Sequence, residues 1–274
     1  GYTASTTCTS SSPCTLSSNV TGNLTLSPTA TLNTYTLTIT KNTGVSTIYY
    51  KVNGEYNWES TTTSKSVTGI KYGTAVTYYY TASTGYTAST TCTSSRPCTL
   101  SSNVTGNLTL SPTAKQNTYT LSITKNTGVN TIYYKVNGEY SWESTTSSRS
   151  VTINHGTSVT YYYTVDSGYT ANESCTSSRP CTLSSNVTGN LTLSPTAKQN
   201  TYTLTITKNT GVNTIHYKVN GAYSWASTTS SRSVTINHGT SVTYYYTVDS
   251  GYTASESCTS SRPCTLSSNV TGNL

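Results

Sequence analysis

Apolar residues and threonines alternate along much of this chain with a period of two. Residues 35–40 are typical, because Tyr35, Leu37 and Ile39 are separated by threonines. Successive side chains of a β-strand point to opposite faces, so the alternation predicts a strand with one buried side. Six such strands are predicted before the sequence begins to repeat, at residues 35–40, 47–52, 65–68, 75–82, 99–104 and 107–111.

Turn-forming residues separate these predicted strands. Lys41–Gly44 follows the first strand, and Asn53-Gly54 follows the second. Asn-Gly favours a tight hairpin, because both central residues of a type I′ turn need a positive φ. Six short strands in a period of 83 to 84 residues predict an all-β fold of small, immunoglobulin-like β-sandwich domains in tandem. A β-grasp-like topology is the alternative.

The apolar faces of the predicted strands define a candidate core for the first domain, with Trp58 capping one end. Its other members are Tyr35, Leu37, Ile39, Ile48, Tyr50, Val52, Val67, Val76, Tyr78, Leu100, Leu108 and Leu110. Residues 69–73 are one residue longer than residues 153–156 and 236–239, which hold the same place in later repeats. Length changes are tolerated best at exposed turns, so we expect this segment on the surface.

One motif, GYTAxxxCTSSxPCTLSSNVTGNL, occurs four times, at residues 1–24, 85–108, 168–191 and 251–274. The repeat predicts domains at residues 33–116, 117–199 and 200–274, the last truncated before its final strand, with residues 1–32 forming the C-terminal part of a repeat. Residues 112–117 read as a short linker that restricts the freedom of neighbouring domains. We expect the 274 residues to be a window on a longer tandem protein.

Composition favours an ordered, extracellular β-protein. The chain contains 64 Thr, 45 Ser and 25 Tyr, with no Phe or Met and only 8% charged residues. Thr and Tyr favour strands, whereas good helix formers are sparse, and disordered segments lack so many aromatic and β-branched residues. The net charge of +7 comes from Lys and Arg spread singly, which indicates a weakly basic surface rather than a nucleic-acid binder. No apolar run reaches the roughly 20 residues that span a bilayer.

Each repeat carries one pair of cysteines with the spacing C-x5-C. An even count in regular local pairs predicts disulfides and an oxidising compartment. The predicted pairs are Cys8–Cys14, Cys92–Cys98, Cys175–Cys181 and Cys258–Cys264. Structural zinc is the alternative, but it needs four ligands, and each repeat offers a single pair with no nearby His. The loop between the cysteines must turn back on itself, since extended chain would hold the thiols roughly 20 Å apart.

Sequons for N-glycosylation recur inside the repeated motif. They begin at Asn19, Asn23, Asn103, Asn107, Asn172, Asn186, Asn190 and Asn269. Sequons arise by chance in a Thr- and Ser-rich chain, but their doubled recurrence in the motif suggests covalent glycans on the surface.

Catalytic chemistry is not predicted. The one recurring carboxylate pair, Glu55 and Glu59, is replaced by Ala222 and Ala226 in the third repeat, which is unexpected for a required acid–base dyad. The chain shows no phosphate-binding loop and no acidic calcium loop. We therefore expect a non-enzymatic protein without metal or cofactor.

Two stretches, YTLTITKNTGVSTIYYKVNG and YGTAVTYYYTASTGYTA, together with the closing NLTLSPTA, resemble the tandem repeats of bacterial surface proteins related to the divergent internalin-type B-repeat. The resemblance covers each whole period. It departs after Gly-Tyr, where Thr-Ala and the cysteine loop replace an aromatic residue and Gly-Trp. The resemblance implies small β-domains, sandwich-like or β-grasp-like, strung in tandem in exported proteins.

The predicted function is mechanical: a structural segment of a cell-surface stalk, adhesin or filament, whose partners are further repeats or copies of itself. A glycan-binding adhesin is one alternative, with Tyr49, Tyr79 and Trp58 as aromatic platforms. The other alternative is a filament subunit in which residues 1–30 of one copy complete the C-terminal domain of the next by strand complementation.

Overall fold

The computed structural model describes all 274 residues, and every regular element in it is a β-strand. The chain divides into two compact units, Gly1–Thr118 and Tyr119–Leu274. The all-β prediction is confirmed, with one two-sheet sandwich in the first unit and two in the second. The structure has no helix long and apolar enough to cross a membrane.

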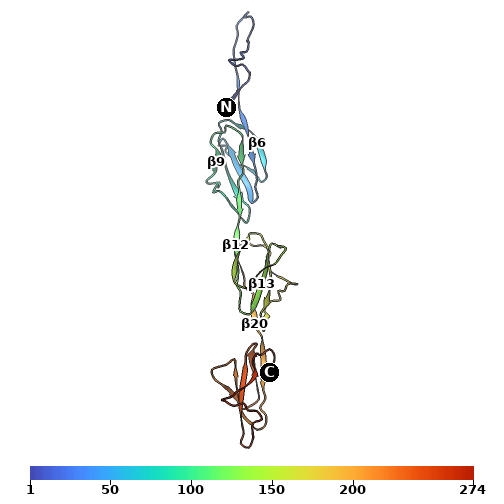
Figure 1. Cartoon of the computed structure of the whole chain (residues 1–274). Coiled ribbons are helices and arrows are strands. Elements are labelled where there is room, and N and C mark those ends of the chain that lie inside the picture. The colour runs from blue at the N-terminus through green and yellow to red at the C-terminus, as the bar shows by residue number, and fades with distance from the viewer. The chain divides into compact units, whose positions relative to one another are not determined.

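The first sandwich consists of seven strands in two sheets (Figure 1). They are β3 (Thr34–Ile39), β4 (Val45–Val52), β5 (Glu59–Thr61), β6 (Lys65–Lys71), β7 (Val76–Ala82), β9 (Cys98–Ser101) and β10 (Leu108–Leu110). The strand orders are β10-β3-β6 and β5-β4-β7-β9. Neighbours run antiparallel except β10, which pairs parallel with β3. A separate ribbon pairs β8 (Tyr86–Ala88) with β11 (Ala114–Gln116).

The second and third repeats use the same plan. The second contains β12 (Thr118–Ile123), β13 (Val129–Val136), β14 (Glu143–Thr145), β15 (Arg149–Asn154), β16 (Val159–Val165), β17 (Tyr169–Ala171), β18 (Cys181–Ser184), β19 (Leu191–Leu193) and β20 (Ala197–Gln199). The third contains β21 (Thr201–Ile206), β22 (Val212–Val219), β23 (Ala226–Thr228), β24 (Arg232–Asn237), β25 (Val242–Val248) and β26 (Cys264–Ser267). Strand β12 has β15 and β19 as neighbours, whereas β21 pairs with β24 alone.

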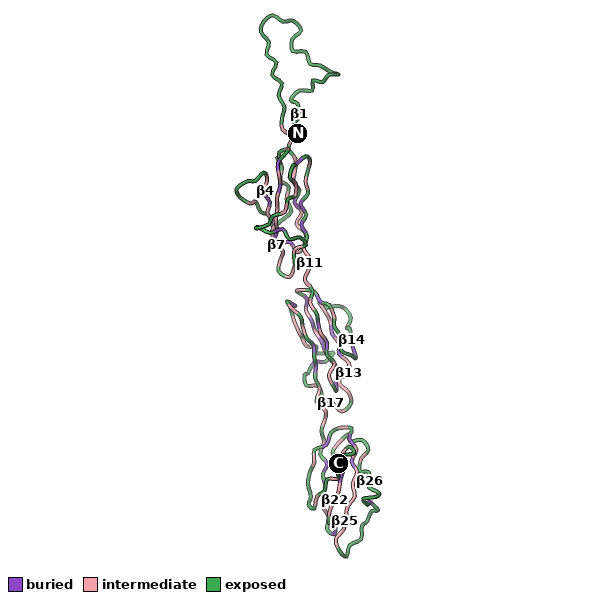
Figure 2. The backbone as a smooth tube through the Cα atoms, turned by 90° about the vertical axis from the view of Figure 1, so that its left-hand side faces the viewer, coloured by how far each residue is buried: buried purple, intermediate pink, exposed green.

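Each sandwich encloses its own apolar core, seen as buried segments inside the strands in Figure 2. All twelve strand residues predicted for the first core belong to it. Its further buried members are Val45, Ile70, Tyr80, Cys92 and Val104. The buried Tyr80 hydroxyl accepts the Thr90 N–H at 3.1 Å and donates to Thr113 O at 2.8 Å. The Tyr80 side chain is therefore buried in this core with its hydroxyl group hydrogen-bonded.

One sequence-based expectation about the first repeat holds in part, and another is wrong. In the segment expected at the surface, Gly69, Lys71 and Gly73 are exposed, but Ile70 is buried. The extra residue, Gly69, is absorbed within β6 at a φ of +82°, and the register with β3 shifts there as in a β-bulge. Trp58 does not cap the core; it lies beside Tyr79, with ring centroids 4.7 Å apart and planes at 80°.

The predicted linker at residues 112–117 contains strand β11 rather than a free connection. Strand β11 pairs with β8, and the Asn117 N–H donates to Gly85 O at 2.8 Å. Residues 1–32 form a matching ribbon, in which β1 (Tyr2–Ala4) pairs with β2 (Ala30–Leu32). Almost all of residues 1–32 are exposed. The connections between repeats are therefore hydrogen-bonded ribbons.

Candidate functional site: the closing strand, its groove and the repeat junction

The last strand of the first repeat closes the sandwich against its first strand. Leu108 lies opposite Leu37, and Leu110 lies opposite Ile39 in the parallel register of β10 and β3. The Thr40 N–H continues the ladder by donating to Leu110 O at 2.9 Å. Leu110 is only 2% exposed. The closing strand thus supplies both hydrogen bonds and core side chains to its own sandwich.

Polar side chains hold the residues that follow the closing strand. The Asn42 amide donates to Ser111 Oγ and to Pro112 O, both at 2.9 Å, and the Tyr80 hydroxyl donates to Thr113 O. In the second repeat, Asn126 and Tyr163 make the same three bonds to the residues after β19. Replacing Asn42 or Asn126 with aspartate or alanine would remove the donor to the backbone carbonyl of Pro112 or Pro195.

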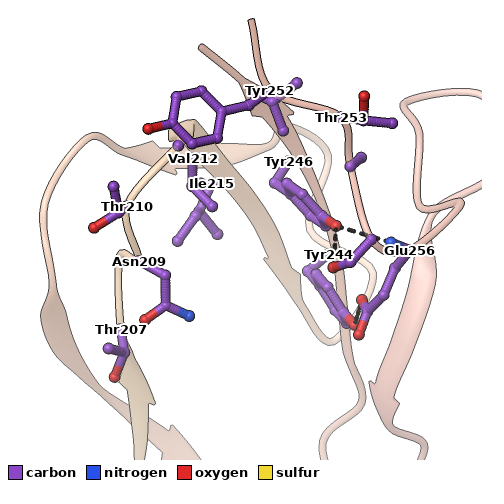
Figure 3. Close-up of a pocket in the computed structure, with 14 residues that line it drawn as sticks. Thr207, Asn209, Thr210, Val212, Ile215, Tyr244, Tyr246, Tyr252, Thr253 and Glu256 are labelled. Atoms are coloured by element: carbon purple, nitrogen blue, oxygen red, sulfur yellow. Dashed lines mark hydrogen bonds between the residues drawn. The ribbon is translucent and has the colours of Figure 1, made fainter.

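In the third repeat the corresponding groups line a groove, shown in Figure 3. Thr207 and Asn209 lie on one side of it, and Tyr246 and Glu256 lie on the other. The cavity has a volume of about 360 Å³. A second cavity of about 240 Å³ is lined mainly by apolar residues. Its lining is Leu204, Thr205, Ile206, Thr207, Ile215, Tyr217, Val242, Tyr244 and Leu266.

A tyrosine and a glutamate bond across the edge of this region in two repeats. The Tyr244 hydroxyl donates to Glu256 Oε2 at 2.7 Å, and the Tyr161 hydroxyl donates to Glu173 Oε2 at 2.6 Å. The bond to Glu256, followed by burial, raises the pKa of Tyr244 to about 12. For Tyr161, burial is the larger cause, and its pKa is also raised. In the first repeat Thr90 occupies the glutamate's place.

The four predicted cysteine pairs form disulfides in the structure. Their Cα atoms are 5.2 to 5.3 Å apart, within the usual range for a disulfide. Between Cys92 and Cys98 the chain reverses, and Thr93 and Arg96 exchange two backbone hydrogen bonds at 3.1 Å. In the third repeat Glu256 lies near the sulfur atoms of the Cys258–Cys264 disulfide. A disulfide offers no thiolate, so this group lacks the ligands of a metal site.

Within each unit, one asparagine clamps a ribbon to the sandwich that follows it. In the second unit, Asn200 N–H donates to Gly168 O, and Asn200 O accepts from His238 N–H, both at 2.8 Å. Its side-chain oxygen accepts from the Thr170 hydroxyl at 2.6 Å. The Gln199 amide adds a bond to His238 O at 3.1 Å. Asn33 plays the same part in the first unit, between Gly1, Thr3 and Tyr72.

The three residues predicted as an aromatic platform come together in the first repeat. The Tyr49 and Tyr79 rings stack with centroids 4.4 Å apart, and Trp58 meets Tyr79 edge-on. The Lys51 ammonium lies 5.0 Å from the Trp58 ring and donates to Tyr56 O at 3.1 Å. The cluster recurs in both other repeats, with a histidine replacing the first tyrosine in the third. The lysine was not predicted from the sequence, although a cation beside a half-buried indole is a common pairing.

The predicted sequon asparagines are all exposed. Two of them also have a structural task, because Asn107 Oδ1 accepts the Thr36 N–H and Asn190 Oδ1 accepts the Thr120 N–H, each at 2.9 Å. Asn107 and Asn190 stand at the start of the closing strand, so these hydrogen bonds are a structural reason for the repeated Asn-Leu-Thr, besides glycosylation. Glycosylation at these positions stays a prediction.

Comparison with known proteins gives a fold relationship. No protein-family model matches the sequence, and no curated protein matches it. Among solved structures, the Bacillus anthracis TIE protein is similar, with a TM-score of 0.57 and 13% sequence identity over 90% of this chain. The likeness shows the fold. The match covers 52% of that protein, so this chain spans about half its length.

Two pilus proteins of Lactobacillus rhamnosus GG match less well. The pilus adhesin SpaC has a TM-score of 0.28 and 9% identity, over 83% of this chain and 38% of its own. The shaft pilin SpaA has a TM-score of 0.21 and 12% identity, over 61% of this chain and 100% of its own. TM-scores this low carry no argument about function. The narrower resemblance to internalin-type B-repeats stays a prediction.

Proposed function

We propose that this chain is a load-bearing segment of a cell-surface stalk, adhesin or filament. The observation that carries the proposal is the parallel pairing of the first and last strands of a sandwich, β3 with β10 and β12 with β19. Tension enters a repeat at the start of its first strand and leaves at the end of its last. Because the two strands are parallel neighbours, these points lie at opposite ends of the pair. Pulling therefore shears all the bonds between the strands together rather than opening them one by one.

Other features support the same role. The residues after a closing strand form a ribbon, such as β11 with β8 after β10. The hydrogen bonds of this ribbon also resist tension, in addition to those of the sandwich. The disulfides support an extracellular location, where such bonds persist. A repeated domain lengthens a stalk without new chemistry, and each copy needs only to resist unfolding.

Single-molecule force spectroscopy tests this proposal. We expect one unfolding step per repeat. Leu193→Ala in β19 and Ile153→Ala in β15 are matched variants, since both side chains are 1% exposed. Each should cost about 2–5 kcal/mol of stability. The first should lower the rupture force of one step clearly more than the second. Equal losses of rupture force in the two variants would contradict a load-bearing closing strand.

A glycan-binding adhesin is the second candidate, favoured by the recurring aromatic cluster. Trp142 and Lys135 repeat the pairing of Trp58 and Lys51 at the same 5.0 Å distance. Apolar ring faces with a neighbouring polar group suit the faces and hydroxyls of a sugar. A glycan array with the intact chain tests this, and the triple variant Trp58→Ala, Trp142→Ala, Trp225→Ala should lose any binding seen. If the intact chain binds no glycan on the array, the glycan-binding candidate is excluded and the mechanical role is the one that remains.

A further inference from the structure

The third repeat carries its aromatic cluster on the outer face of the sheet β23-β22-β25-β26. Tyr217 of β22 is buried in the core, so its neighbours His216 and Lys218 lie on the opposite, outer face. The rings of His216 and Tyr245 stack there with centroids 4.3 Å apart. Trp225 meets Tyr245 edge-on at 4.7 Å, and the Lys218 ammonium lies 5.0 Å from the Trp225 ring. All four side chains are half-buried, so part of each is accessible to a ligand.

The charges around this cluster differ between the repeats. Residues 45–61 and the matching residues of the second repeat each contain one lysine and two glutamates, which sum to a formal charge of −1. Residues 212–228 keep the lysine, Lys218, but Ala222 and Ala226 replace the two glutamates, which leaves a formal charge of +1. The same aromatic cluster is therefore set in an acidic hairpin twice and in a basic hairpin once.

The other carboxylates of the third repeat do not offset this charge on the outer face. Asp249 follows the end of β25, and its Oδ1 accepts the Asn213 amide at 3.0 Å. Glu256 Oε2 accepts the hydroxyl of Tyr244, a residue that packs against the core. Within the four strands of the sheet, Lys218 is the one residue of the types Lys, Arg, Asp and Glu. An anionic ligand on this face thus meets a cation without a competing carboxylate.

The rest of the outer face bears hydroxyl groups. Thr243 lies opposite Lys218 in the strand register, and Thr265 lies opposite Thr243. A stable protein interface has an apolar centre, whereas this face alternates rings with hydroxyls. Rings and hydroxyls together suit a sugar better than they suit an acidic protein.

A fully exposed tyrosine stands beside the cluster, two residues before Trp225. Tyr223 is 104% exposed, and the corresponding Tyr56 and Tyr140 are 96% and 103% exposed. A side chain this exposed adds nothing to the packing of the fold. Tyrosine and tryptophan are the residues that most often carry the energy of a binding surface. The exposed ring therefore favours a ligand at this edge of the sheet.

We propose that the outer face of the third repeat selects an acidic polysaccharide, one whose sugars bear carboxylate or sulfate groups. The proposal rests on the glycan-binding candidate above and names the class of its ligand. The Lys218 ammonium donates a charge-assisted hydrogen bond to the anionic group. Trp225 and Tyr223 contact the apolar face of a sugar ring. His216 adds an N–H donor for a hydroxyl, since an imidazole has at least one N–H in either charge state. The first two repeats lack this selectivity, because their glutamates repel the anion.

A panel of acidic oligosaccharides, each beside its uncharged counterpart, tests the proposal with the intact chain. The panel contains uronic-acid oligomers beside their methyl esters, and sulfated oligomers beside their desulfated forms. We expect an acidic member to bind about tenfold more tightly than its counterpart, as is usual for a hydrogen bond to a charged group. Lys218→Gln should abolish this preference. Arg232→Gln removes the same charge from the exposed end of β24, in the other sheet, and should leave the preference unchanged.

Exchanging the hairpin charges between repeats separates selectivity from damage to the fold. Ala222 and Ala226 are exposed, so Ala222→Glu with Ala226→Glu removes no ring and no packing contact. This double variant should lose the acidic preference as Lys218→Gln does. Glu139→Ala with Glu143→Ala makes the opposite exchange in the second repeat. Combined with Lys218→Gln, it should restore the preference at the new site.

Equal affinity of the intact chain for acidic and uncharged sugars would overturn the proposal and leave the glycan-binding candidate standing. An acidic preference that persists in Lys218→Gln would overturn it as well, because the anion would then bind elsewhere. A poly-glutamate peptide that binds as tightly as the acidic sugars would show recognition of charge alone, which also contradicts it. If no member of the panel binds, the candidate and the proposal fall together, and the force measurements on the mechanical role are unaffected.

Discussion

Gly168 lies directly against the imidazole ring of His238, within the second unit. A Cβ atom placed on Gly168 would overlap that ring, and the residue has a φ of +81°. Gly1 has the same relationship to the Tyr72 ring in the first unit. Gly1 and Gly168, which each open a Gly-Tyr-Thr-Ala motif, are thus also packing surfaces for the turn of the sandwich that follows.

Gly168→Ala should therefore destabilise the junction between the second and third sandwiches for two reasons. A positive φ costs an alanine about 1–2 kcal/mol, and the new methyl group must also displace the ring. Gly221→Ala is the control, since Gly221 has a φ of +65° with nothing within 4 Å. Amide hydrogen exchange at Asn200 and His238 should rise in Gly168→Ala alone. Equal exchange in the two variants would contradict the contact.

Removing the second-repeat disulfide with Cys175→Ser and Cys181→Ser should lower the stability of that sandwich by about 2 kcal/mol. The value follows from releasing a loop of about seven residues in the unfolded chain. The matched control is Cys8→Ser with Cys14→Ser, because that loop belongs to the exposed residues 1–32. Chemical denaturation should detect the first change and not the second. Similar losses from both pairs would argue against a sandwich-specific role.

Alkaline pH should destabilise the third sandwich through Tyr244. Its folded pKa of about 12 lies above the ordinary value of 10, so the folded state holds the phenol proton longer than the unfolded state does. The resulting stability is complete below pH 10 and is lost as the pH rises to about 12. Glu256→Gln keeps an acceptor for the hydroxyl but removes the charge, and it should shrink this loss. Unfolding free energies from pH 9 to 12 check the sign; a gain of stability in that window would refute it.

Asn190→Ala should destabilise the second sandwich by about 1 kcal/mol, because the Thr120 N–H loses its acceptor. Asn186→Ala removes the neighbouring sequon and should change stability by no more than about 0.5 kcal/mol, as is usual for exposed positions. Denaturation of protein made in a host without N-glycosylation measures both. If the two variants behave alike there, the Asn-Leu-Thr repeat has no structural role of this kind.

Alternation of apolar residues and threonines was enough to predict the fold class and the core. Leu37, Ile48 and Val76 could be placed inside because each lies on the apolar face of a strand several residues long. The strands β5, β8 and β11 were missed because each has three residues without two large apolar side chains in alternation, whereas the equally short β10 has Leu108 and Leu110 on either side of Thr109. Strand β11 was also read as a linker, since its Ala-Lys-Gln sequence carries no apolar face.

The candidate site was harder to predict, because it depends on which strands pair. The period of a strand tells which side is buried but not which neighbour lies beside it, so the parallel register of Leu108 with Leu37 was not readable. Local sequence suggested the aromatic cluster only through its residue types, because no predicted hairpin joins the strands of Tyr49 and Tyr79. The Asn42 and Tyr80 side chains gave no such signal, since their acceptors are backbone carbonyls about 30 or 70 residues away.

Closure of a sandwich by its last strand also sets when it can fold. The parallel ladder pairs Leu37 with Leu108, so it cannot form until both residues are available. Contacts between residues so distant along the chain make folding slow. A chain synthesised from its N-terminal end therefore keeps the current repeat open until its last strand has been made. Each repeat closes only after its final residues are available, so the order of strands makes the repeats close one after another along the chain.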